Sequence, residues 1–214
     1  MEGQEREKVN YWTVAFLYGL CCGVLPIIGA EILWDTVANP LWERCLARDI
    51  TESFLRAALM EESFKFLGFW LADRRYKFTS EREFMLAAGM VGLVYGIIEK
   101  IVTMNLINII LGIVFPMHVL WQLNQGRHFY AYRMAKAQGD RKRARIKLFR
   151  ATVCVFVMHG CWDALLSLVS YFIGRDDIPD AEVYGGLLFA GIIIAGILYT
   201  VLTLRKTIRV LKKK

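Results

Sequence analysis

The chain has 214 residues, of which 56% are hydrophobic and 13% aromatic, and its formal net charge at pH 7 is +7. A soluble domain of this length rarely has so apolar a composition, so the sequence excludes an ordinary water-soluble protein. The positive charge follows the membrane topology described below, and we expect no nucleic acid as a partner.

Most of the apolar residues stand in blocks of about 20, the length that a helix needs to cross the hydrocarbon layer of a bilayer. In chain order, the predicted membrane-spanning helices cover 11–33, 52–72, 84–104, 106–125, 148–173 and 183–205. The sequence therefore predicts an all-α, polytopic membrane protein with about six transmembrane helices. We expect a single membrane-embedded domain over residues 1–214.

The second of these segments carries several charges in an otherwise apolar and aromatic stretch: Glu52, Arg56, Glu61, Glu62 and Lys65. A charged side chain at the bilayer centre costs ~3 kcal/mol on insertion scales. We include the segment as a span because the remaining residues suit lipid and the loop topology requires it. Its charges then need a polar environment between the helices.

Lysine and arginine are strongly segregated between the predicted loops. One side of the membrane holds 2 of these basic residues in the N-terminus, 4 in the second loop, 9 in the fourth loop and 6 in the tail. The other side holds 4. The positive-inside rule then places both termini in the cytoplasm. We expect the basic segment 127–147 to form an amphipathic helix on the anionic cytoplasmic leaflet, with a break near Gly139 and Asp140.

A short set of ionisable residues remains inside the spans: Glu61, Glu62, Lys65, Glu99, His118, His159 and Asp163. At ~1.5 Å rise per residue, all of them lie about 10–22 Å from the cytoplasmic end of their helices. Independent structural residues on four helices have little reason to share a depth. The sequence therefore predicts a polar cavity near the middle of the bilayer.

The spacing of these residues predicts which of them face one another. His159 and Asp163 are four residues apart and lie on one face of their helix, as do Glu61 and Lys65. Close carboxylates raise one another's pKa, which suits a general acid or base. A histidine oriented by a carboxylate can bind a metal or donate to an oxyanion.

Each residue also has a purely structural interpretation. Glu61 and Lys65 can form an ion pair that lets the helix insert, and His118 can serve as a hydrogen-bond donor between helices. Asp163 can accept from a neighbouring side chain, and Glu99 can extend to the membrane interface. Their coincidence at one depth favours a common site.

Four stretches carry a resemblance to a known family: "EESFKF", "VYGIIEK", "FPMHVLWQLNQG" and "VMHGCWDALL", all within residues 50–175. The order is a glutamate pair with lysine, an aromatic residue with glutamate, a lone histidine, and His-x-x-x-Asp. Together the four stretches resemble the PrsW family of intramembrane proteases, which is distantly related to the CAAX prenyl endopeptidases.

The resemblance implies an endopeptidase that hydrolyses a peptide bond of a membrane-anchored protein. In that case Glu61 or Glu62 would activate the attacking water, and the other glutamate would turn toward Lys65 or another partner. The sequence leaves open which glutamate is the base.

The resemblance also implies roles for the remaining residues. His118 and His159 would bind zinc or another divalent metal or, without metal, would stabilise the oxyanion. Asp163 would orient His159 or bind the metal directly. Glu99 would be a third metal ligand or an acceptor beside one, and Tyr95 would support the site.

Two other kinds of protein remain possible from the sequence. A proton-coupled transporter or channel would use the same buried carboxylates and histidines as a proton relay. A scaffold with a degenerate protease core would only hold a partner helix. The sequence leaves open the substrate and the oligomeric state.

Overall fold

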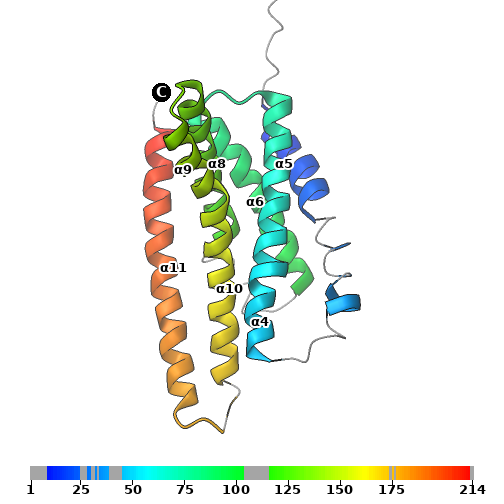
Figure 1. The fold of residues 1–214 in the computed structure, drawn as a ribbon, viewed down its shortest axis with the longest axis vertical. Coiled ribbons are helices and arrows are strands. Elements are labelled where there is room, and N and C mark those ends of the chain that lie inside the picture. Colours follow the sequence, from blue (N-terminus) through cyan, green and yellow to red (C-terminus); the bar gives the residue numbers. More distant parts are fainter. Residues whose placement is uncertain are drawn as a thin grey trace, which may run out of the picture.

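The computed structural model describes residues 9–24, 28–29, 32, 34–38, 45–103, 116–173, 175 and 177–212. These residues contain helices and connecting turns, and no strand. The described elements are α1 (Tyr11–Thr13), η1 (Val14–Val24), η2 (Trp34–Ala38), α4 (Leu46–Glu52), η3 (Ser53–Met60), α5 (Glu61–Tyr76), α6 (Glu81–Thr103), α8 (Met117–Ala137), α9 (Arg141–Ala151), α10 (Val153–Ile173) and α11 (Ala181–Leu211). They form an elongated helical bundle (Figure 1).

The elements α4, η3 and α5 continue one another, because the residues at both junctions keep right-handed helical dihedrals. The helix therefore extends beyond the predicted span 52–72 at both ends. Its middle section, η3, is π-helical, a rare geometry that is often found at functional sites. Glu61 is the first residue after this section.

The turn between α5 and α6 is fixed by local hydrogen bonds. Lys77 ends α5 in the left-handed conformation, with a φ of 51°. The Ser80 N–H then donates to Glu83 Oε2 at 3.3 Å, and the Glu83 N–H donates back to Ser80 Oγ at 3.2 Å. This reciprocal pattern is a capping box, which explains why α6 begins here.

The predicted division between a span at 106–125 and a surface helix at 127–147 differs from the structure. Residues 106–115 lie outside the described part of the chain, and α8 runs from Met117 to Ala137 without a break. The helix continues through Gly126. A Cβ at this position would lie 2.3 Å from the carbonyl oxygen of Phe84 on α6. This glycine serves the close packing of α8 on α6. The chain turns only at Gly139, with a φ of +76°, before α9 begins.

Two stretches of the described chain, Arg141–Ile173 and Ala181–Leu211, are long and apolar enough to cross a membrane by length and composition. Only 17% of the most apolar window of the second stretch is buried inside the protein, so most of its apolar side chains face outward. An outward-facing apolar surface suits lipid contact. The polytopic, all-helical class is confirmed, and the number of six spans stays a prediction.

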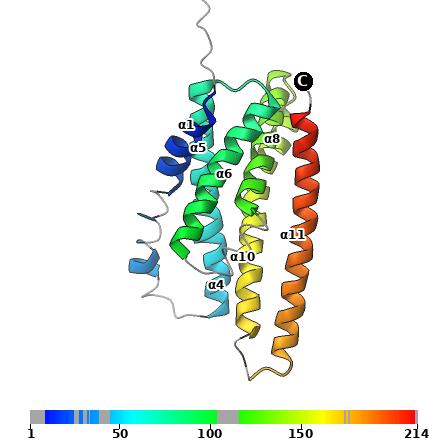
Figure 2. The same ribbon diagram turned by 180° about the vertical axis from the view of Figure 1, so that it is seen from behind.

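The basic parts of the chain gather at one end of the bundle. Figures 1 and 2 place the end of α5, the whole of α9 and the end of α11 together at this end, and the turn between α10 and α11 at the other. We call the first the basic end.

The aromatic rings of Phe69, Phe78, Phe84 and Phe129 join α5, α6 and α8, with ring centroids 5.4 to 6.3 Å apart.

Candidate active site

Lys65 lies at the centre of a buried polar cluster, and its own exposure is 0%. Its Nζ donates to Glu62 Oε1 at 2.8 Å and to Glu61 Oε2 at 3.1 Å, both on the same helix. Nζ also lies 2.9 Å from Nδ1 of His118 on α8 and 3.8 Å from the ring centroid of Tyr95 on α6. The lysine therefore connects three helices through charged and polar contacts.

His159 on α10 lies between carboxylates on both sides of its ring. Nδ1 lies 2.9 Å from Glu62 Oε1, while Nε2 lies 3.1 Å from Asp163 Oδ2 and 3.7 Å from Glu61 Oε2. Asp163 is one helical turn from His159, as its spacing predicts. These contacts fix the orientation of the imidazole ring.

His118 is held by contacts at both ring nitrogens. Nδ1 faces Lys65, and Nε2 lies 2.7 Å from Oε2 of Glu99 on α6. Glu99 thus lies on the far side of the imidazole ring from the centre of the cluster. This position fits an orienting partner of His118 better than the third metal ligand that the resemblance implies as one of its two roles.

Two residues of this cluster were not identified from the sequence. Gln122 is fully buried, and its Nε2 donates to Glu62 Oε2 at 2.7 Å. Trp121 stacks on His159, with ring centroids 4.6 Å apart. Gln122 lies four residues after His118, so helical spacing could have indicated it, but an uncharged amide gives no comparable insertion signal.

Two glycines let the helices of the cluster approach closely. A Cβ at Gly92 on α6 would lie 2.5 Å from the carbonyl oxygen of His118, and a Cβ at Gly160 on α10 would lie 2.4 Å from Phe54 Cδ1 on η3. Neither position has room for a larger residue without movement of a neighbour. Glycine at these positions therefore lets His118 and His159 reach the glutamate pair.

The carboxylates of the cluster differ in their exposure to the surroundings. The Glu62 side chain is 4% exposed, and both of its oxygens accept hydrogen bonds, from Lys65 and Gln122 among others. Glu61 is 14% exposed, and Asp163 and Glu99 are each 30% exposed. Glu61 is therefore the more accessible member of the glutamate pair.

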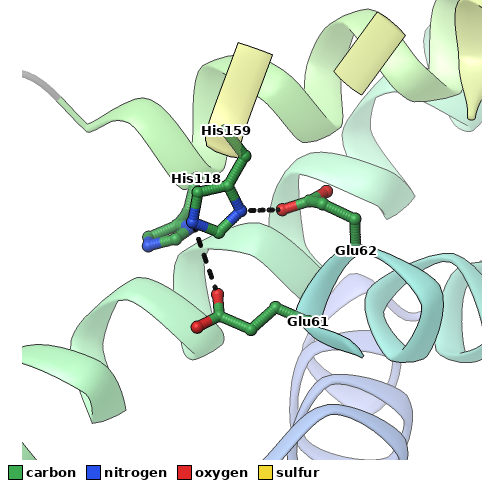
Figure 3. A group of neighbouring side chains, drawn as sticks. All are labelled: Glu61, Glu62, His118 and His159. Carbon is green, nitrogen blue, oxygen red and sulfur yellow. Dashed lines mark hydrogen bonds and ion pairs between the residues drawn. The ribbon is translucent and has the colours of Figure 1, made fainter. Parts of the chain in front are cut away.

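Four side chains of the cluster have donor atoms suited to a metal ion: Glu61, Glu62, His118 and His159 (Figure 3). One donor atom from each lies within 4.8 Å of all the others. Two imidazoles and two carboxylates match the ligands of catalytic zinc sites. The residues present therefore fit a divalent metal such as zinc.

All the site residues expected from the sequence meet in one place. Glu61, Glu62 and Lys65 come from α5, Tyr95 and Glu99 from α6, His118 from α8, and His159 and Asp163 from α10. Direct contacts join them into one network. Whether a water-filled cavity adjoins them stays a prediction.

Comparison with known protein families gives an independent result. The family model described as PrsW family intramembrane metalloprotease matches residues 7–198, a range that includes every residue of the cluster. No match was found among curated proteins or among solved structures. Because the family model matches most of the 214 residues, the chain belongs to the PrsW family of intramembrane metalloproteases.

Proposed function

We propose that the protein is an endopeptidase that hydrolyses a peptide bond of a membrane-anchored protein, within or next to its transmembrane segment. The observation that carries this proposal is the juxtaposition of two glutamates and two histidines from three helices, with donor atoms within 4.8 Å of one another. Family membership supports the same reaction class. It does not favour a proton-coupled transporter or channel.

In the proposed mechanism, Glu61 is the general base. It is more exposed than Glu62, and one of its oxygens lies 3.1 Å from Lys65 and 3.7 Å from His159. A water beside this carboxylate would lose its proton to Glu61 while it attacks the scissile carbonyl carbon. The same proton would then pass to the leaving amine.

The other residues position the reacting groups. Glu62 holds Lys65, His159 and Gln122 in place through hydrogen bonds. Asp163 orients His159, and Glu99 does the same for His118. With Lys65 moved aside, His118, His159 and Glu62 would hold a divalent metal, which would polarise the scissile carbonyl and make a water beside Glu61 more acidic.

Newly formed protein N-termini in host membranes test this proposal. Membranes containing the wild type, Glu61→Gln or the control Glu182→Gln would be compared by mass spectrometry; Glu182 is a surface residue in the first turn of α11. We expect new termini next to transmembrane segments with the wild type and the control, and none with Glu61→Gln. Identical termini in all three samples, at equal levels of inserted protein, would contradict the proposal.

A further inference from the structure

A second polar region lies at the basic end, away from the buried cluster. A hollow of about 350 Å³ opens between α8, α9 and the first turn of α6. We call it the basic hollow and define it by six lining residues: Glu81, Arg127, His128, Gln138, Arg143 and Lys147. The proposed proteolytic chemistry uses none of them.

The basic hollow has more positive charge than its own acidic residue can neutralise. Arg127 Nε donates to Glu81 Oε1 at 3.2 Å, which uses the one carboxylate of the lining. Within the described ranges, no carboxylate pairs with the side chain of Arg143 or Lys147. Two cations thus face the hollow without a counter-ion.

His128 adds an unused hydrogen-bonding group to this region. Its Nδ1 is buried and has no partner among the residues that the structure describes. Burial, together with the charges of Lys147 and Arg127, lowers the pKa of His128 to about 4. An anion in the hollow would supply the counter-charge that Arg143 and Lys147 lack.

The surroundings of the hollow suit a lipid headgroup. α9 leads directly into the apolar helix α10, and large apolar side chains are exposed along this passage, among them Ile146, Phe149 and Val153. Acyl chains could lie against these side chains while the headgroup reaches Arg143 and Lys147. Basic pockets beside transmembrane helices are suited to anionic headgroups.

We propose that the basic hollow is a binding site for a phosphate group, with Arg143 and Lys147 as its cationic contacts and His128 in its lining. The phosphate can belong to an anionic phospholipid or can be a free ion. Guanidinium and ammonium groups are the side chains that bind phosphate oxygens most strongly. The site is separate from the proposed protease chemistry and can be tested without a protease substrate.

The test uses the full-length protein in nanodiscs. Retention of phosphatidylglycerol would be measured by native mass spectrometry after reconstitution in mixtures with phosphatidylcholine, and inorganic phosphate would be titrated in nanodiscs of phosphatidylcholine alone. The double variant Arg143→Gln/Lys147→Gln removes the two cations. Lys142→Gln/Arg145→Gln removes the same charge from α9 at two exposed positions that do not line the hollow.

We expect the first double variant to weaken retention of the anionic lipid, or binding of free phosphate, by roughly tenfold or more relative to the wild type. The second double variant should bind either probe within about twofold of the wild type. Its two cations do not line the hollow and contribute only to the general attraction of the protein to an anionic leaflet. Retention of phosphatidylglycerol without binding of inorganic phosphate would identify a lipid headgroup as the ligand. Binding of inorganic phosphate without retention of phosphatidylglycerol would identify the free ion as the ligand. Equal losses in both double variants, or no binding of either probe by the wild type, would overturn the proposal.

Discussion

At the scale of single residues, Lys65 lies where a divalent cation would have to bind. Its ammonium contacts three of the four metal-donor side chains, Glu61, Glu62 and His118, at 2.8 to 3.1 Å. A cation at this position and a metal ion in the same donor set would repel each other strongly in a buried site. Metal binding therefore requires Lys65 to move away.

Replacement of Lys65 by methionine tests this relation. Lys65→Met keeps most of the side-chain volume but removes the positive charge, so we expect the affinity for zinc to rise by about tenfold or more. Competition with a coloured chelator on purified protein would measure it. An affinity equal to or below that of the wild type would mean that Lys65 supports the donor geometry instead of competing with the metal.

His128 gives a prediction for the dependence of stability on pH. It lies outside the two stretches that are long and apolar enough to cross a membrane, and its pKa is about 4 in the folded protein against an ordinary value of 6.5. The shift comes from burial and from nearby cations on α8, α9 and α11: Lys147, Arg127, Arg150 and Lys206. As pH falls from about 6.5 toward 4, the unfolded chain binds a proton more readily than the folded protein, so stability falls.

We expect the melting temperature of the wild type to fall more between pH 7 and pH 4.5 than that of His128→Gln, which lacks the titrating ring. Thermal unfolding in detergent by tryptophan fluorescence would measure both proteins. Carboxylates titrate in the same range, but they are common to the two proteins and cancel in the difference. Parallel melting curves at all pH values would count against the depressed pKa of His128.

At the scale of elements, the close packing of α6 on α8 positions His118. Gly92 faces the backbone of α8 beside His118, and Gly96 packs against the ring, where a Cβ would lie 3.5 Å from His118 Cδ2. A side chain at Gly92 would push α8 away from α6. His118 would then move relative to both Lys65 and Glu99.

Gly92→Ala is therefore expected to lower stability by roughly 1–3 kcal/mol and to reduce cleavage of substrate. The control is Gly191→Ala on α11, where a Cβ would meet nothing within 4 Å. That change should leave stability equal or slightly higher, because alanine favours helix over glycine. Thermal unfolding and a cleavage assay would compare Gly92→Ala with Gly191→Ala. Equal stability of the two variants would contradict the close packing of α6 on α8 at Gly92.

Helical spacing and depth were enough to predict which charged residues meet. Glu61, His118 and Asp163 could be identified because charges and imidazoles inside an apolar span require partners. Gln122 and Trp121 could not, since an amide or an indole in a span costs little enough to have many structural explanations. Their roles depend on how α8 is rotated against α5 and α10, which one sequence does not specify.

The ends of the helices were harder to predict than their existence. The predicted span ends at residue 125, but Gly126 packs against α6 and α8 continues to Ala137. The π-helical section η3 also has no clear sequence signal. Both features depend on packing between distant segments, and local propensity does not contain that information.

At the scale of the whole molecule, the basic end and the turn between α10 and α11 lie at opposite ends of the bundle (Figure 1). The positive-inside rule then predicts α9 and the end of α11 on the cytoplasmic side. The turn at 177–180 would lie on the other side. Bundle geometry and charge distribution thus predict a specific orientation.

Cysteine labelling in intact cells tests this orientation. In a background whose native cysteines are replaced, a membrane-impermeant maleimide should label Asp177→Cys and should label Lys142→Cys only after the membrane is permeabilised. Both positions are exposed in the structure. Labelling of Lys142→Cys in intact cells would place the basic end outside the cytoplasm and reverse the topology.

The proposed activation of water by Glu61 is the step on which peptide hydrolysis depends. It is tested most directly by single-turnover cleavage of a purified membrane-anchored substrate, identified from the newly formed termini, by the reconstituted protein. We predict that Glu61→Gln lowers the cleavage rate by about 10²-fold or more, the range for loss of general-base catalysis, while its melting temperature stays at that of the wild type. A folded Glu61→Gln variant that cleaves within a few-fold of the wild-type rate would contradict the assignment.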